Sequence, residues 1–192
     1  MMEDRRRVIE EVKRALKLLE EDPIFYKLIP EVRTNLVMCV EDAKSIEDVV
    51  GVPGRITHVF GKVVPVGEPA YGGSWHMARL LLAIRRYFPE IRAAMNLRYY
   101  EELVKLAKEL GYVVSFFDRR KEPEEIKRVE GRTMEWAAGE IYKNAGGRTP
   151  QIAYDLGDWG KEPGIVVFGR SATEVVEIAL RLAHEAARRG II

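Results

Sequence analysis

The chain has 192 residues and a mass of 22.0 kDa, and 47% of its residues are hydrophobic. This length suits one compact domain with at most a short added segment, and it excludes a large multidomain assembly. Lysine and arginine (31 residues) nearly cancel aspartate and glutamate (30 residues), so the net charge of +1 gives no general attraction to nucleic acid or to an anionic membrane. Any anionic ligand must therefore be held by a local site.

The composition favours a reducing cytoplasm and a thermophilic source. Charged residues make up 32% of the chain, whereas it has one glutamine and three asparagines. The single cysteine, Cys39, cannot form an internal disulfide, and its apolar neighbours favour a buried small side chain over a nucleophile. No apolar stretch follows the basic start as in a signal peptide, and no segment approaches the roughly 18 apolar residues of a membrane span. We therefore expect neither export nor membrane insertion.

An amphipathic helix is predicted over residues 3 to 21, ahead of a main domain that we expect to cover residues 23 to 192. Val8, Ile9, Val12, Leu16 and Leu19 recur at helical spacing, and Pro23 ends the pattern. The three arginines at 5 to 7 are followed on the same helix by glutamates, which favours a solvated face over a basic arm. We expect this helix of the segment 1 to 22 to pack on the domain or on a second subunit and not to bind DNA.

The next stretch predicts a strand in NLVMCVED after Pro30, then a short helix that opens with Ser45 and Asp48 and ends at Gly51. The segment RITHVFGKVVPVG is rich in β-branched residues and predicts two strands separated by Gly61. From 74 to 88 the apolar spacing is helical again.

The remaining chain alternates between strands and helices. Strands are predicted at AAMNLRY, YVVSFFD, IAYDLG and IVVFG, and helices at about 101–110, about 122–142 and from Ser171 to just before Gly190. This alternation indicates an α/β fold. Two pairs of strands are too close in sequence for a crossover helix, so both pairs should be antiparallel. They are the two strands within RITHVFGKVVPVG, and the strand IAYDLG with the strand IVVFG. A purely parallel Rossmann sheet is disfavoured on this reasoning, and neither GxGxxG nor GxxxxGK[ST] is present.

The sequence Gly72-Gly73-Ser74 leads into the predicted helix that carries His76 in its first turn. Free amides and the helix dipole at this place favour an anion and a neutral imidazole, which can donate a hydrogen bond to a phosphate. The alternative is a histidine that simply packs beside its neighbours. His58 alternates with Ile56 and Phe60 along a strand, which favours a core position, and His184 in the last helix is interpreted as structural.

Further candidate residues stand at strand ends. Arg55 begins a strand after Pro53-Gly54, where it either projects into a site or is an ordinary surface arginine. Three histidines and one cysteine, widely spread, make no zinc site, whereas a hard cation held by carboxylates and substrate phosphates stays open. Arginine forks beside carboxylates suit a phosphorylated ligand. The candidates for phosphate or substrate binding at the other strand ends are Asn96, Arg98, Asp118, Arg119, Asp155, Gly157, Lys161 and Arg170.

Several segments together resemble one family. In this order and spacing, PEVRTNLVM, VPGRIT, YGGSWHMARLLLAIRRYFPEIRAAMNLRY, FFDRRKEP and IAYDLGDWGKEPGIVVFGR resemble the ThiN family, the archaeal-type thiamine-phosphate synthase domain. The resemblance runs from about Asp22 to the C-terminus. It implies a three-layer α/β/α fold with a mixed, mostly antiparallel sheet, similar to the class II aldolase and epimerase fold.

The resemblance also implies a reaction. The family couples hydroxymethylpyrimidine diphosphate to hydroxyethylthiazole phosphate, giving thiamine phosphate and pyrophosphate, and we expect Mg2+ to assist the diphosphate. The arginine and histidine that separate catalysts from repressors in the family fall on Arg55 and His76.

The family usually appears fused behind a pyrimidine kinase or behind a DNA-binding segment, and neither is expected here. A sensor module that binds thiamine phosphate without turnover is the alternative function. A phosphosugar aldolase is disfavoured because no metal-binding histidine cluster is evident. A homodimer is expected.

Overall fold

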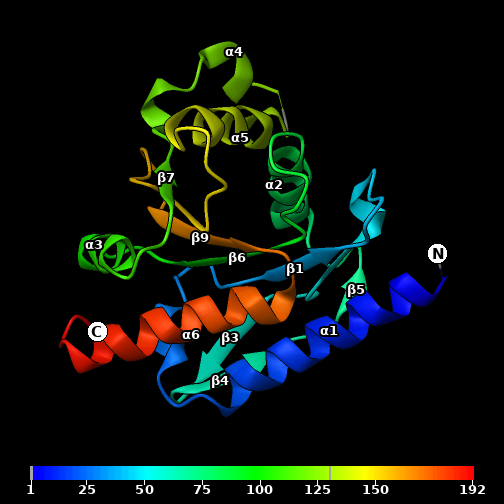
Figure 1. Ribbon diagram of the computed structural model, residues 1–192, viewed down its shortest axis with the longest axis vertical. Helices are drawn as coiled ribbons and strands as arrows, with labels where there is room; N and C mark the ends of the chain where they lie inside the picture. Colours follow the sequence, from blue (N-terminus) through cyan, green and yellow to red (C-terminus); the bar gives the residue numbers. More distant parts are fainter. Residues whose placement is uncertain (1, 130) are drawn as a thin grey trace.

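The computed structural model describes residues 2–129 and 131–192, which form three layers around a central sheet (Figure 1). The strands of this sheet are β1 (Leu36–Cys39), β2 (Val49–Gly51), β5 (Ala70–Tyr71), β6 (Ala93–Arg98), β7 (Val114–Phe116), β8 (Ile152–Asp155) and β9 (Gly164–Gly169). Their order is β5-β2-β1-β6-β9-β8-β7. Within the described residues every neighbouring pair is antiparallel except β7 with β8. The predicted mixed, mostly antiparallel sheet is confirmed.

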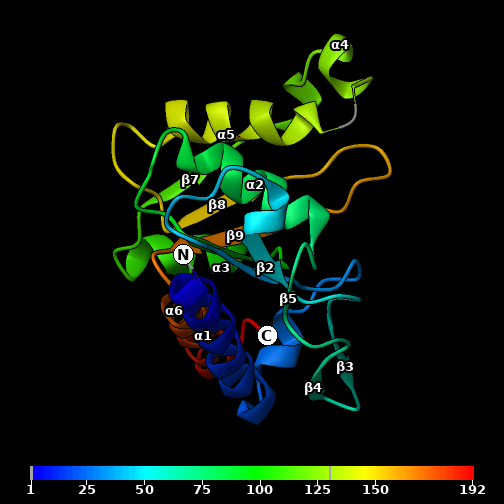
Figure 2. The ribbon, with the colours of Figure 1, turned by 90° about the vertical axis from the view of Figure 1, so that its right-hand side faces the viewer.

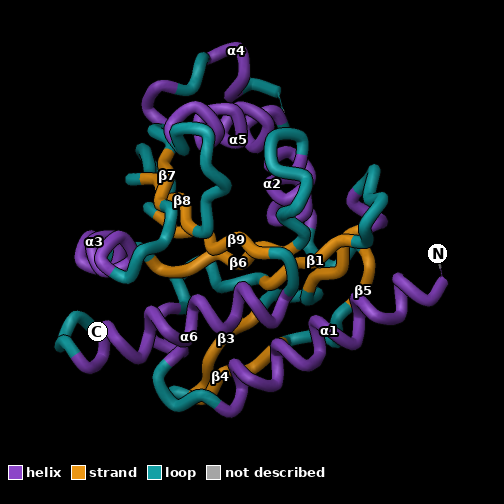
Figure 3. The backbone as a smooth tube through the Cα atoms, in the orientation of Figure 1, coloured by secondary structure: helices purple, strands orange, loops and turns teal. Residues whose placement is uncertain are grey.

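Helices cover both faces of the sheet (Figure 3). One face carries α1 (Met2–Glu21), α3 (Glu101–Glu109) and α6 (Ala172–Arg188). The other face carries α2 (Trp75–Arg85) and α5 (Arg132–Asn144), with the short α4 (Glu124–Lys127) beyond α5. The three-layer α/β/α arrangement expected from the sequence is therefore confirmed.

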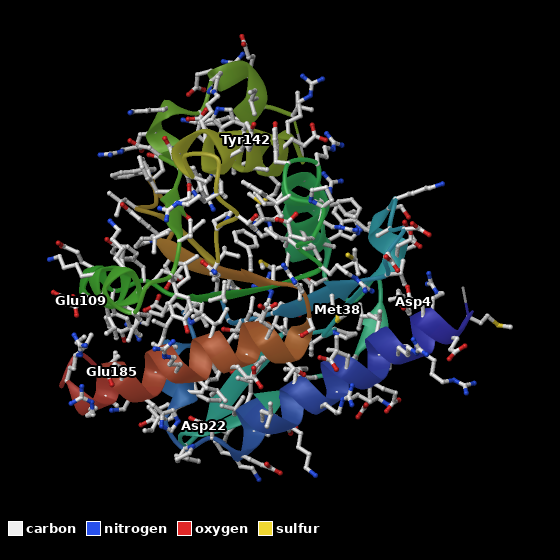
Figure 4. The ribbon with its side chains drawn as sticks, in the orientation of Figure 1. Asp4, Asp22, Met38, Glu109, Tyr142 and Glu185 are labelled. Carbon is white, nitrogen blue, oxygen red and sulfur yellow. The ribbon has the colours of Figure 1, made fainter. Side chains whose placement is uncertain are left out.

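Each strand contributes alternate side chains to two separate cores, as a pleated backbone requires. Met38 and Met95 pack in the core beneath α1 and α6, where Figure 4 shows Met38 between the sheet and these helices. Their neighbours Val37 and Ala94 point to the opposite face and pack against α2 and α5. Cys39 is buried in this second core, as predicted, so its thiol has no access to solvent.

The amphipathic stripe of α1 is buried against the domain. Val8, Val12, Leu16 and Leu19 are all less than 5% exposed and share one core with α6, and Figure 2 shows α1 and α6 side by side. The predicted packing of this helix on the domain is confirmed. His184 of α6 lies within hydrogen-bond distance of Asp22 at the end of α1, in keeping with its predicted structural role.

A second, two-stranded sheet pairs β3 (Ile56–Val59) with β4 (Lys62–Pro65). The two strands are antiparallel, as are β8 and β9, and both predictions are confirmed. Phe60 and Gly61 form the connecting turn with φ of 49° and 81°, the left-handed conformations that tight hairpins favour. The core position predicted for His58 is wrong. His58 is exposed because no layer covers this side of the hairpin, and its ring faces Tyr26 at a centroid distance of 5.5 Å.

Two helix boundaries also differ from the prediction. The segment 46 to 51 is a single 3-10 turn, Ile46–Asp48, followed by β2, because Val49 and Val50 pair with β1. The Ser45 and Asp48 capping box itself is present. The helix predicted at about 122–142 is divided into α4 and α5, which Gly131 separates with a left-handed φ of 85°.

Candidate active site

A cavity of about 580 Å³ opens where loops and strand ends from both halves of the sheet meet the amino-terminal end of α2. Its floor includes residues at the carboxyl end of β6 and the beginning of β9. Seven of the predicted site residues line it: Arg55, Ser74, His76, Asn96, Arg119, Asp155 and Lys161. Segments more than 100 residues apart in the sequence thus supply one site.

His76 lies in the first turn of α2, two residues after the N-cap residue Ser74. The pKa of His76 is held below its usual value, first because the cavity walls displace water from the ring, and then because of the positive charges of Arg119, Arg55 and Lys161. Asp155 acts in the opposite direction. All four of these charged residues line the same cavity as His76. His76 is accordingly neutral at pH 7 and can donate a hydrogen bond to an anion there.

Arg119 and Asp155 form a buried ion pair at the cavity wall. Arg119 Nε donates to Asp155 Oδ1 at 2.9 Å, and the amide of Gly157 donates to the same oxygen at 2.9 Å. The second oxygen of Asp155 accepts no hydrogen bond from residues 2–129 and 131–192. The pair fixes the arginine and leaves one carboxylate oxygen for a ligand.

Arg55 occupies a left-handed backbone conformation, with φ of 71°, at the end of a tight turn before β3. Its guanidinium donates to the carbonyl oxygen of Val32 at 2.5 Å and the residue is exposed at the cavity. An arginine in this position keeps several N–H donors for an anion.

Asn96 lines the cavity, but its side chain supports the backbone. Its Oδ1 accepts from the amide of Asn35 at 2.8 Å, and its Nδ2 donates to the carbonyl oxygen of Arg33 at 2.9 Å. The structure thus places Asn96 as a support for the turn at residues 30 to 35, and not as a free phosphate ligand.

Six other predicted residues lie outside the cavity lining: Gly72, Gly73, Arg98, Asp118, Gly157 and Arg170. A Cβ atom on Gly73 would lie 2.4 Å from the carbonyl oxygen of Gly51, so a glycine is required by close packing there. Asp118 pairs with Arg120 at 2.8 Å.

Arg98 is the last residue of β6, and Arg170 directly follows β9. The Arg98 guanidinium lies 5.6 Å from the ring centroid of Tyr100, and the amide of Arg170 donates to Glu174. The geometry gives these two residues no part in the site.

The match to known proteins decides the family. The family model described as thiamine-phosphate synthase ThiN matches residues 11–181. The chain belongs to the ThiN family.

Two relatives support this assignment. The ThiN chain is 41% identical, over 92% of its length and 93% of the relative, to thiamine-phosphate synthase ThiN of Methanothermobacter thermautotrophicus. It is 38% identical, over 91% of its length and 40% of the relative, to the bifunctional thiamine biosynthesis protein ThiDN of Methanocaldococcus jannaschii.

A solved structure shares the fold. The crystal structure of the C-terminal domain of phosphomethylpyrimidine kinase aligns with a TM-score of 0.85 and 44% identity, over 92% of this chain and 98% of that one. A sugar-phosphate aldolase from Thermotoga maritima aligns more distantly, with a TM-score of 0.48 and 14% identity. Among the described residues of the ThiN chain, no helix is long and apolar enough to cross a membrane.

Sequence reasoning missed several residues that line the ThiN cavity. Arg33 and Trp75 contribute to its mouth, and Thr133 and Met134 reach it from the first turn of α5. Thr133 donates to the otherwise buried Glu122 at 2.6 Å. The resemblance between PEVR and VPGR, each an arginine after a proline-containing turn, was the signal that could have identified Arg33.

Proposed function

We propose that this ThiN domain couples hydroxymethylpyrimidine diphosphate to hydroxyethylthiazole phosphate inside the cavity that His76 and Arg55 line. The observation that carries this proposal is the convergence of Arg55, Arg119 and Lys161 on His76 at the amino-terminal end of α2. Such a cluster suits a diphosphate, whose charge grows as it leaves.

The chemistry needs a site that stabilises the leaving group. The bond between the pyrimidine methylene carbon and the diphosphate oxygen breaks, and its electron pair leaves with the diphosphate. The ring amino group stabilises the resulting cation, and the thiazole nitrogen then donates its lone pair to form the new C–N bond. This sequence requires no covalent enzyme intermediate, so no nucleophilic side chain is needed.

Arg55, His76 and the first amides of α2 can each interact with the departing diphosphate. Arg55 is permanently charged and can bind the diphosphate through two N–H groups. His76 hydrogen-bonds to the leaving oxygen, because its lowered pKa keeps the imidazole neutral at pH 7 and a neutral imidazole donates through one ring N–H. The first amides of α2 add positive partial charge, because Ser74 makes no side-chain capping bond among the described residues.

Mg2+ is part of the proposal, and the residues present fit it. No group of three or more histidine, cysteine, aspartate or glutamate side chains in the described part of the chain can hold a metal alone. Mg2+ ordinarily binds through one or two carboxylates together with substrate phosphates. Asp155, with its free second oxygen in the cavity wall, would hold the ion, and the ion would supply charge to the leaving diphosphate.

Product formation tests the proposed function directly. The purified protein is incubated with both substrates and Mg2+, and thiamine phosphate and pyrophosphate are measured. Formation of both products in equal amounts is expected. Tight binding of thiamine phosphate without product formation would instead select the sensor alternative.

The proposal includes a homodimer in the cytoplasm. Apolar side chains at the β3 and β4 hairpin support a second copy as the partner, since Val59, Phe60 and Val66 are all more than half exposed. A monomer by light scattering across the working concentration range would contradict the dimer.

A further inference from the structure

Two arginines of this chain stand at matching positions in two tight turns. The amide of Arg33 donates to the carbonyl oxygen of Pro30 at 3.0 Å, and the amide of Arg55 donates to that of Val52 at 3.0 Å. Each arginine thus closes a four-residue turn, and each has a left-handed backbone, with φ of 73° and 71°. Arg55 was predicted from the sequence as a site residue, and Arg33 was not.

The two turns are joined side by side. The residues after the arginines, Thr34 and Ile56, form a β-bridge with N···O distances of 3.2 and 2.7 Å. The buried side chain of Asn35 fixes the same geometry, because it both accepts from and donates to the backbone of Val52 at 2.9 Å. Both arginines line the same cavity as a result.

The backbone conformation of these two arginines costs free energy. A positive φ is unfavourable for any residue with a Cβ, and arginine has no short polar group that hydrogen-bonds locally as asparagine does. Among the described residues only Phe60 also has a positive φ without being glycine. Strained residues that persist in a cavity point to a ligand.

The guanidinium groups of Arg33 and Arg55 are held by different backbone oxygens. Arg33 donates to the carbonyl oxygen of Glu31 at 2.9 Å, and Arg55 donates to that of Val32 at 2.5 Å. Glu162 supports the same turn, since its carboxylate accepts from the amides of Glu31 and Val32 at 3.2 and 3.3 Å. The cavity lining therefore holds a second cationic side chain beside Arg55.

We propose that Arg33 forms a second anion subsite, which binds a phosphate monoester: the phosphate of the thiazole substrate and the same group in the product. This inference rests on the proposed function, in which two phosphorylated substrates must occupy one cavity. Arg55 binds the group that leaves, and Arg33 binds the group that stays. The two matching turns thus hold one arginine for each substrate.

Calorimetric titration with thiamine phosphate and with thiamine tests this subsite, using the wild-type protein and the variant Arg33→Gly. The wild-type protein should bind the phosphate ester at least tenfold more tightly than thiamine, and Arg33→Gly should lose most of that preference. Glycine adopts a positive φ freely, so the melting temperature should stay the same or rise. Arg98→Ala is the control, because it removes an arginine that lies outside the cavity lining; the preference for the ester should be unchanged in this variant.

Steady-state kinetics provides the second measurement. In Arg33→Gly the KM for the thiazole phosphate should rise about tenfold, while the KM for the pyrimidine diphosphate stays within about twofold. If the wild-type protein prefers the ester and Arg33→Gly keeps that preference, the subsite is overturned and the proposed function is unaffected. A wild-type protein that neither prefers the ester nor forms product would overturn both.

Discussion

Arg119 donates to Asp155 across a distance of 2.9 Å, and the side chains of the pair are only 15% and 7% exposed. The two residues come from different parts of the chain: Arg119 follows β7, and Asp155 ends β8. Because β7 and β8 are parallel neighbours, both residues reach the same end of the sheet. The ion pair therefore couples the stability of the fold to the shape of the cavity.

Replacing Asp155 with asparagine should destabilise the protein by about 3 kcal/mol, because the buried guanidinium loses its countercharge. At this chain length that corresponds to a fall in melting temperature of about 6–12 °C. Scanning calorimetry measures it. Glu140→Gln is the matched control, since Glu140 pairs with Lys143 on an exposed helix surface and should contribute less than about 1 kcal/mol. The double variant Arg119→Met with Asp155→Asn should cost less than the sum of the single changes, and full additivity would contradict the coupling.

Arg55→Ala and His76→Ala should each lower turnover by about a hundredfold or more, equivalent to about 3 kcal/mol of transition-state stabilisation. Both side chains line the cavity and neither belongs to a hydrophobic core, so their removal leaves no core void and the melting temperature should change little. Steady-state assays at saturating substrates measure the effect. Arg98→Ala and Arg170→Ala, which alter arginines outside the cavity, should retain normal turnover. Near-normal turnover in either cavity variant would remove that residue from the proposed mechanism.

The imidazole of His76 should titrate below the ordinary value of 6.5, because the cavity walls and three nearby cations disfavour its charged form. Since the unfolded chain then binds more protons in the window just below pH 6.5, the stability due to His76 is fully present above that window and falls as the pH is lowered through it. NMR titration of the ring, assigned by comparison with His76→Gln, measures this pKa. Added pyrophosphate should raise it and leave the resonances of His184, on the far face, unmoved. An unperturbed titration in both states would contradict the electrostatic arrangement.

Excess chelator should abolish product formation, and added Mg2+ should restore it, because the departing diphosphate needs a countercharge beyond Arg55. The fold should survive, since the described residues provide no closed metal site. Parallel measurements of activity and of circular dichroism separate the two effects. Turnover undiminished by the chelator would remove the metal from the account.

Local sequence patterns predicted those parts of the fold that depend on residues close together in the sequence. The stripe of α1, the antiparallel pairs and the capped start of α6 at Ser171 follow from periodicity and turn chemistry. The break at Gly131 was not predicted, because helices also tolerate an isolated glycine, and the sequence does not reveal that this glycine takes a left-handed φ of 85°. The exposure of His58 likewise depends on which layer covers the hairpin, and alternation along a strand carries no such information.

The part of the candidate site that could be predicted consists of charged residues at strand ends or in the loops that follow them. Arg55, Arg119, Asp155 and Lys161 stand at strand ends or in loops, and the topology brings these ends together. Arg33 was not predicted because the only signal for it, the likeness of PEVR to VPGR, is short and says nothing of a cavity. The supporting role of Asn96 depends on the neighbouring turn, which sequence spacing does not reveal.

The crystal structure of the protein with thiamine phosphate, pyrophosphate and Mg2+ is the measurement that tests the central claim most directly. The account predicts pyrophosphate in contact with Arg55 and His76, and the product spanning the cavity towards Arg33. Ligands bound elsewhere, with this cavity filled only by water, would contradict it.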